Sequence, residues 1–236
     1  GYPTATPVGK RAKRVAVVGF ESNISVPLKE GITAALSALL PGRTVTIKSG
    51  MTAMLTVLDA HVPDIHRYVI LDVGGSVTSC AVILKESVSR SAIVPEGLLT
   101  ILKRVSAAGL PEETLTQLRM LESDSCSSDT CKALKDSLAR AEPDLTKVFG
   151  ETFASLASKR RLPNAAILSA PAELSPWLQG FFARIDFSQF TATMQPFIVE
   201  TLTPDHLRDM STWQAAAPDT GLSIAAGYVN ILEQAR

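Results

Sequence analysis

One segment of the sequence combines a carboxylate with glycines at a spacing that suits phosphate chemistry. An apolar run ends near Asp72, Gly74 and Gly75 can form a tight turn with Ser76, and a second apolar run begins at Thr78. Glycines let backbone N–H groups approach an anion closely, and an aspartate can hold a hydrated Mg²⁺ ion. The segment therefore predicts a phosphate site in a β-hairpin, although Asp followed by Gly-Gly also forms ordinary hairpin turns.

Hydrophobic spacing predicts the elements that would position this hairpin. The predicted strands cover residues 15–20, 43–48, 68–73, 78–84, 88–94, 165–168 and 197–202. The predicted helices cover residues 27–40, 51–60, 98–108 and 111–120, a long stretch after Pro143, and residues 173–183 and 222–232. Strands that alternate with helices are typical of an α/β domain, so the hairpin is expected in a sheet that helices cover.

Composition limits the partners that the chain can bind. Basic and acidic residues balance at 23 each, so the chain lacks the broad positive field that attracts nucleic acid. No apolar run reaches the roughly 18–20 residues that cross a bilayer, and residues 1–10 lack the apolar segment of a secretory signal. We therefore expect a cytoplasmic protein without direct membrane insertion, whose partner is a protein or a small ligand.

Two stretches are predicted to be connections. Residues 1–14 mix Pro, Gly and Thr and end in a basic run, which is more typical of a linker or a cut end than of a phosphate-binding or membrane-surface patch. Residues 122–129 are polar enough for an exposed loop.

Few other residues suggest chemistry. Cys80 lies in an apolar run, whereas Cys126 and Cys131 could close a small loop, although the lack of an export signal favours free thiols. The histidines at positions 61, 66 and 206 are too scattered to predict a zinc site or a triad. The sequence has neither a Walker loop nor a nucleophile elbow, and no catalytic residue is predicted. The aromatic residues within 181–190 are predicted to be core rather than an exposed partner-binding patch.

The stretch from Ile70 to Ile83 resembles the second phosphate-binding hairpin of the actin-like ATPases, and within that superfamily it is most similar to the bacterial FtsA and PilM group. The hairpin of that group reads approximately Asp-Ile-Gly-Gly-Gly-Thr-Thr-Asp. Its matching positions here are Asp72, Gly74, Gly75 and Thr78. The departures from it are Ser76, Val77 and Ser79.

Two later stretches extend the resemblance. Ile93 to Thr100 resembles, in contracted form, a glycine turn that opens a helix, which adds Gly97 to the implied cofactor-binding residues. Gly221 to Gly227 looks like the terminal helix of the same family. The resemblance covers about residues 15 to 235 and corresponds to the second half of the fold. It implies an α/β domain with the ribonuclease H-like topology, a mixed sheet flanked by helices, over residues 15–236, with a helical subdomain at about 98–142.

The resemblance also implies cofactors. ATP and Mg²⁺ would be held by Asp72, Gly74, Gly75, Ser76, Thr78 and Gly97, with Asp72 contacting Mg²⁺ through water. One departure counts against nucleotide binding. Where the family has an adenosine Gly-Gly turn, this chain has Ser169-Ala170-Pro171-Ala172, so side chains and a proline ring replace open backbone.

The function that the resemblance implies is a scaffold of a type IV pilus or cell-division assembly, peripheral to the inner membrane through its protein partners and able to self-associate. The absence of a C-terminal amphipathic membrane helix slightly favours the pilus role. The alternatives are an active ATPase or sugar-kinase-type phosphotransferase of the same fold, and a scaffold whose nucleotide site has decayed.

Overall fold

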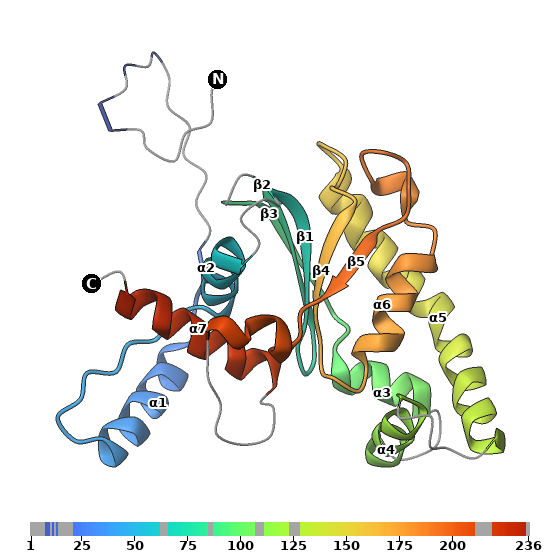
Figure 1. The fold of residues 1–236 in the computed structure, drawn as a ribbon, viewed down its shortest axis with the longest axis horizontal. Coiled ribbons are helices and arrows are strands. Elements are labelled where there is room, and N and C mark those ends of the chain that lie inside the picture. The colour runs from blue at the N-terminus through green and yellow to red at the C-terminus, as the bar shows by residue number, and fades with distance from the viewer. Residues whose placement is uncertain are drawn as a thin grey trace.

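A five-stranded mixed sheet forms the centre of the molecule. The computed structural model describes residues 8–9, 11, 13, 21–61, 66–84, 87–106, 111–122, 128–210 and 219–234. The strand order is β3-β2-β1-β4-β5 (Figure 1). The strands are β1 Arg67–Val73, β2 Thr78–Leu84, β3 Ser87–Val94, β4 Ala165–Ser169 and β5 Ile198–Thr201. β1, β2 and β3 form an antiparallel meander, whereas β4 pairs in parallel with β1 and with β5. The predicted β1–β2 hairpin is therefore confirmed.

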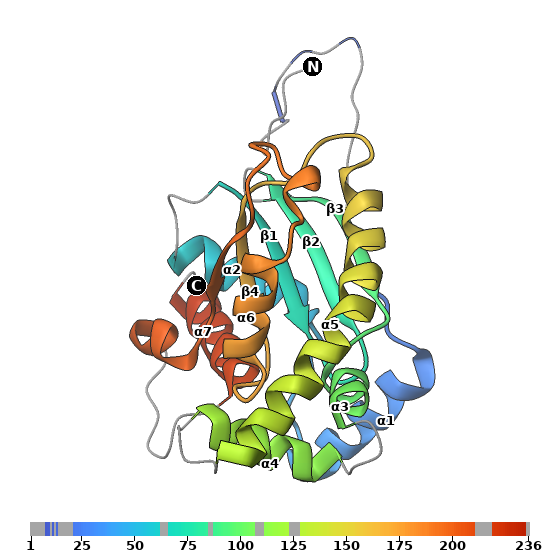
Figure 2. The same ribbon diagram turned by 90° about the vertical axis from the view of Figure 1, so that its right-hand side faces the viewer.

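Helices cover both faces of the sheet. The helices are α1 Val26–Leu39, α2 Gly50–His61, α3 Leu98–Ser106, α4 Pro111–Glu122, α5 Ser128–Ala157, α6 Ser175–Arg184 and α7 Thr220–Gln234, with the short 3-10 helices η1 Ser188–Phe190 and η2 Pro204–Met210. We call the two faces the α5–α6 face and the α2–α7 face after the helices that pack on them (Figures 1 and 2). Apart from the cases below, the predicted helices and strands are confirmed with small differences at their ends.

Strand alternation divides β1 between two cores. Val69 and Leu71 pack into the core of the α5–α6 face, whereas Tyr68 and Ile70 pack into the core of the α2–α7 face. The first core is rich in phenylalanine. Its rings, many of them meeting edge to face, belong to Phe149, Phe153, Phe181, Phe182, Phe187 and Phe197. The prediction that the aromatic residues of 181–190 are core is therefore confirmed for Phe181, Phe182 and Phe187.

The predicted start of the long helix after Pro143 is wrong, because α5 begins at Ser128 and runs through the proline. Proline lacks the N–H that would bond to the carbonyl of Ala139, which is why a helix boundary was predicted there. The buried stripe continues across it, with Leu138 on one side and Leu145 on the other. Tertiary packing on both sides holds the helix together across the missing hydrogen bond.

We expect the Pro143→Ala variant to be more stable than the parent by about 1–2 kcal/mol, because alanine restores the hydrogen bond and fits a helix interior better. Urea unfolding followed by circular dichroism measures this gain. A loss of stability would instead mean that the proline ring itself contributes packing at this position.

The strand predicted at 43–48 is wrong, since this segment has no regular structure between α1 and α2. Its apolar alternation fits a strand, but a strand needs a neighbour with which to exchange hydrogen bonds. Within the described residues, no strand of the sheet pairs with it. The strand predicted at 15–20 lies outside the described residues, and so do residues 123–127 of the loop predicted at 122–129. The other residues of that loop belong to helices, Glu122 to α4 and residues 128–129 to α5.

The cysteines differ in state. Cys80 is a buried free thiol in β2, and its burial raises its pKa to about 12. Cys131, near the start of α5, is disulfide-bonded, contrary to the expectation of free thiols.

Candidate functional site

The β1–β2 hairpin exposes backbone N–H groups at its tip. Gly74 donates its N–H to the carbonyl of Val77 at 2.9 Å, which leaves Gly75 and Ser76 as the loop. Both loop residues are exposed, and among the described residues their N–H groups donate to no protein atom. A Cβ built on Gly75 would meet nothing within 4 Å. The tip is therefore open to an anion that accepts from these N–H groups.

The first residues of helix α3 form hydrogen bonds with the backbone of this loop. Leu98 and Leu99 donate their N–H groups to the carbonyls of Gly74 and Gly75 at 2.9 and 2.8 Å. A Cβ on Gly97 would lie 2.5 Å from the nitrogen of Val77 and 2.6 Å from the carbonyl oxygen of Gly74. The structure thus places Gly97 against the hairpin backbone, where only glycine fits, and the capped carbonyls keep the loop amides turned outward.

Thr78 lies on the side of the hairpin away from Asp72. Its side chain is fully buried, and its hydroxyl donates to the carbonyl of Glu96 at 2.6 Å. The buried carboxylate of Glu96 pairs with Arg104, which also reaches Asp144 of α5 at 3.3 Å. Because opposed strand residues share a face, Thr78 points to the α5–α6 side, where it stabilises the loop that carries Gly97.

Asp72 lies on the α2–α7 face at the carboxyl end of β1. Its cross-strand partner is Ser79, and its partner on the parallel side is Ser169, so two hydroxyl residues flank the carboxylate. Burial raises the pKa of Asp72, and a hydrogen bond with Ser169 opposes that shift. The arrangement is a partly buried carboxylate at the carboxyl end of the central strand, in the same hairpin as the open amides, and α/β proteins hold ligands at the carboxyl ends of their strands.

In the structure Asp72 lies three residues before the exposed loop of Gly75 and Ser76 in the same hairpin, whereas the side chain of Thr78 lies on the opposite face of the sheet. Sequence reasoning treated Ser79 only as a departure and missed the role of Ser169. The two-residue period of a strand could have identified Ser79, because it opposes Asp72 while Thr78 opposes Val73. No local signal identifies Ser169, which reaches the site through pairing between strands roughly 100 residues apart.

The residues at the hairpin fit one part of a magnesium nucleotide. The amides of Gly75 and Ser76 would hold phosphate oxygens, and Asp72 would hold Mg²⁺ through water, which would neutralise the phosphate charge. Within the described residues, no group of three His, Cys, Asp or Glu side chains forms a direct metal site. The turn after β4 offers less, because Pro171 has no N–H and its carbonyl accepts from Leu174 and Ser175 at 3.0 Å. At Pro171 the adenosine part would therefore find neither a backbone donor nor an unengaged carbonyl.

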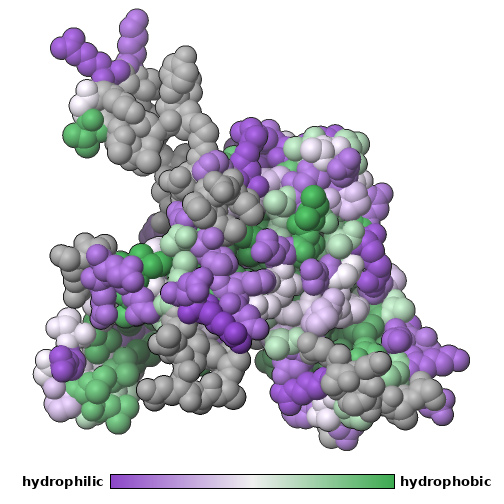
Figure 3. All heavy atoms as spheres, in the orientation of Figure 1, coloured by the Kyte–Doolittle hydropathy of each residue, from purple (hydrophilic) through white to green (hydrophobic). Residues whose placement is uncertain are grey.

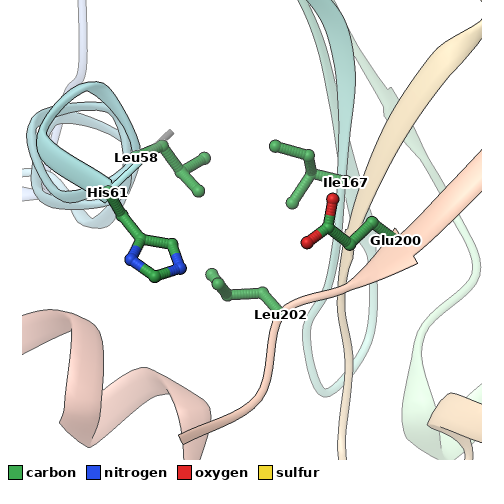
Figure 4. Close-up of a pocket in the computed structure, with 5 residues that line it drawn as sticks. All are labelled: Leu58, His61, Ile167, Glu200 and Leu202. Atoms are coloured by element: carbon green, nitrogen blue, oxygen red, sulfur yellow. The ribbon is translucent and has the colours of Figure 1, made fainter. Parts of the chain in front are cut away.

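A second, smaller feature lies on the α2–α7 face near β5. A pocket there has an apolar floor of Leu58, Ile167 and Leu202, with His61 and Glu200 at its rim (Figure 4). The ring of His206 lies 6.3 Å from that of His61, so two of the histidines that the sequence scatters are neighbours in the fold. The phosphate site that the sequence predicts is a separate feature, located at the hairpin that follows the carboxyl end of β1.

None of the described helices is both long enough and apolar enough to pass through a membrane.

Comparison with known proteins shows the fold. No family model and no curated protein matches the sequence. The structure is similar to one in the "PilM-PilN type IV pilus biogenesis complex", with a TM-score of 0.54 and 15% identity over 86% of this chain and 58% of that chain. A weaker likeness is to the apo pSK41 ParM protein, with a TM-score of 0.43 and 15% identity over 77% of this chain and 48% of that chain. Another is to the ethanolamine utilization protein EutJ from Carboxydothermus hydrogenoformans, with a TM-score of 0.44 and 15% identity over 87% of this chain and 72% of that chain.

The chain thus spans about half the length of the ParM and PilM chains. At this level of identity the likeness concerns the fold and not the activity. The mixed sheet, the helices on both of its faces and the glycine hairpin between β1 and β2 agree with that likeness. The chain therefore has the actin-like ATPase fold.

Proposed function

We propose that this chain belongs to an actin-like scaffold that binds protein partners and uses the β1–β2 hairpin to hold the phosphates of Mg-ATP. One observation carries the phosphate part. Two loop amides, those of Gly75 and Ser76, have no protein partner among the described residues, and they follow the partly buried Asp72 within the same hairpin. Outward amides and a carboxylate form the donor and acceptor set that a magnesium phosphate needs.

The exposed helix α1 supports a protein partner. Its 14 residues include none that is buried, and Leu28 and Leu39 are 55% and 76% exposed. Figure 3 shows the resulting apolar surface over α1. A helix of this length is marginal in water without tertiary packing, so a covering partner would stabilise it.

The partner that we propose belongs to a type IV pilus or a cell-division assembly at the inner membrane, with this chain on the cytoplasmic side. The structure with a TM-score of 0.54 comes from a pilus biogenesis complex with PilN, which favours the pilus assembly. The chain would reach the membrane through this partner and not by insertion.

Calorimetric titration of Mg-ATP into the chain, with Asp72→Ala as the control, tests the phosphate part. We expect micromolar binding that the variant loses, since the variant cannot hold Mg²⁺. No binding by a folded parent would favour a scaffold with a decayed site. Phosphate release measured in the same samples tests the enzyme alternative, because steady turnover lost in Asp72→Ala would indicate an ATPase.

Asp72 also makes a prediction about stability and pH. Its pKa is raised in the folded chain, so its ionisation opposes folding. The contribution of Asp72 to the free energy of unfolding is most favourable at pH values below its pKa in the unfolded chain. That contribution is lost as the pH rises through its pKa in the folded chain. We therefore expect Asp72→Asn to melt at a higher temperature than the parent at pH 7, and the difference to vanish at about pH 3, where both side chains are neutral.

Thermal unfolding followed by circular dichroism at the two pH values measures this effect. Asp136 is exposed on α5, so Asp136→Asn serves as the matched control and should not shift the melting temperature. A lower melting temperature for Asp72→Asn at pH 7 would show that the carboxylate stabilises the fold.

A further inference from the structure

Two connections lie side by side at the end of the sheet opposite the hairpin. One joins α5 to β4 over residues 158–164, and the other joins α6 to β5 over residues 185–197. Asn164 of the first donates its side-chain amide to the carbonyls of Gln195 and Pro196 in the second, at 3.0 and 3.3 Å. Both connections lie at the top of Figure 1, whereas the hairpin follows the lower end of β1. This surface is therefore separate from the proposed phosphate site.

The α5–β4 connection carries basic side chains without acidic partners. Lys159, Arg160 and Arg161 are exposed, and no ion pair among the described residues includes any of them. Arg90 of β3 donates to the carbonyls of Leu156 and Arg160, the latter at 2.7 Å. Burial lowers the pKa of Arg90, and the charge of Arg160 lowers it further. The positive charge here exceeds what the end of α5 needs, because Arg90 already bonds to its carbonyls.

The acidic residues in or near the two connections do not compensate this charge. Glu151 of α5, Asp186 and Glu200 of β5 form no ion pair with the basic side chains. The carboxylate of Asp186 instead accepts from the N–H of Ser188 at 3.2 Å and from its hydroxyl. This end therefore keeps a local positive charge in a chain whose total charge is balanced.

The α6–β5 connection presents an apolar side chain on a hydrogen-bonded turn. Met194 is 58% exposed, and its φ of 59° lies in the left-handed region, which a methionine adopts at a cost. Arg161 donates to the carbonyls of Gln189 and Thr191 at 2.9 and 3.3 Å, and it also contacts the Sδ atom of Met194. The hydroxyl of Thr191 donates to the carbonyl of Gln195 at 2.7 Å. These bonds hold a strained residue whose side chain is largely in solvent, which indicates binding rather than packing.

The side chains of this surface favour a protein segment over a bilayer. Clusters that recognise anionic lipid hold about 4–8 Lys or Arg side chains. Here the guanidinium groups of Arg90 and Arg161 are engaged by carbonyls, which leaves Lys159, Arg160 and the exposed Arg67 at the start of β1. Met and Arg are enriched at interfaces between proteins. The complement of this surface is a segment that combines carboxylates with an apolar side chain.

We propose that the α5–β4 and α6–β5 connections bind an acidic segment of a protein partner. Lys159 and Arg160 pair with its carboxylates, and Met194 contacts an apolar side chain of the segment. The proposal rests on the partner binding proposed above and adds to it a surface and a chemical class of partner.

Fluorescence anisotropy of a short fluorescein-labelled peptide, in which leucines alternate with glutamates, tests this with the whole chain. We expect saturable binding that weakens as salt is added, because salt screens charges at a protein surface. The same peptide with glutamine in place of glutamate should bind at least about tenfold more weakly.

Variants of the chain locate the binding. Lys159→Glu combined with Arg160→Glu should raise the dissociation constant at least about tenfold. The matched pair Lys132→Glu and Lys135→Glu, also exposed but near the start of α5, should leave it within about threefold. Met194→Gly should raise it about threefold or more, and should melt no lower than the parent, since glycine adopts a φ of 59° without strain.

The remaining outcomes overturn the proposal. Failure of the acidic peptide to bind, or equal weakening by the Lys132 and Lys135 pair, would mean that this end does not select carboxylates. Sedimentation with phosphatidylglycerol vesicles in place of peptide binding, lost in the Lys159 and Arg160 variant, would identify lipid phosphate as the ligand. Dimers of the parent in size-exclusion chromatography, lost in the same variant and found in place of peptide binding, would identify a second copy. None of these results alters Mg-ATP binding at the hairpin, so the two proposals can fail separately.

Discussion

The Gly97→Ala variant is expected to lose about 3 kcal/mol of unfolding free energy, at the upper end of what overpacking costs. Its added methyl group would lie 2.5 Å from the nitrogen of Val77, 2.6 Å from the carbonyl oxygen of Gly74 and 2.7 Å from the carbonyl carbon of Ser76. All three atoms belong to the backbone, so no side chain can rotate away. Relief requires the hairpin to move off α3, which breaks the hydrogen bonds that Leu98 and Leu99 donate.

The matched control is Gly75→Ala, two residues from Val77 in the same hairpin. Its Cβ meets nothing within 4 Å, and the backbone of Gly75 is not in the left-handed region. We expect its stability to stay within about 1 kcal/mol of the parent, on the stabilising side, because alanine restricts the unfolded chain. Urea unfolding of both variants measures the contrast. Equal stabilities of the Gly97→Ala and Gly75→Ala variants would mean that Gly97 does not contact the hairpin backbone this closely in solution.

Phe153→Ala should be the most destabilising single change in the α5–α6 core, with a loss of about 3–5 kcal/mol. Phe153 is fully buried, and its ring centre lies 5.0 Å from that of Phe187 and 5.3 Å from that of Phe197. Both contacts are edge to face, so the variant loses ring contacts as well as buried area. The surrounding rings lie on α5, on α6 and at residues that directly precede η1 and β5, and they can fill the cavity only in part.

Chemical unfolding of Phe153→Ala beside Val229→Ala measures this loss. Val229 is 51% exposed on α7, so its truncation should change the stability by less than about 0.5 kcal/mol. If the folded fraction of Phe153→Ala is too small, Phe153→Leu provides a milder change in the same direction. A loss below about 1 kcal/mol for Phe153→Ala would indicate that the core repacks around the missing ring.

Local patterns predicted much of this fold. The β1–β2 hairpin is a contact between neighbours in sequence, so its apolar runs and glycines were sufficient. The same local reasoning failed at Pro143, where packing on both sides of the proline outweighs a missing hydrogen bond. It failed again at 43–48, because alternation describes a strand but does not supply the neighbour that a strand needs.

The candidate site was predicted in part for similar reasons. Asp72 and Gly75 follow from residue type and spacing. Thr78 was grouped with Asp72, but it lies on the other side of the sheet, and Gly97 has a packing role that composition alone does not reveal. Ser169 joins the site only when β4 pairs with β1, which no local pattern of either segment determines.

The mixed pairing of β1 also sets an order of folding. On one side β1 pairs with β2 through a two-residue loop, and on the other it pairs with β4 roughly 100 residues later in the chain, so the first contact closes with a much smaller loss of chain entropy. We expect variants in the hairpin to slow refolding, and variants in β4 mainly to speed unfolding. A chain emerging from the ribosome would then form the phosphate loop early. Ser169 would come next to Asp72 only when β4 pairs with β1, in the last step of folding.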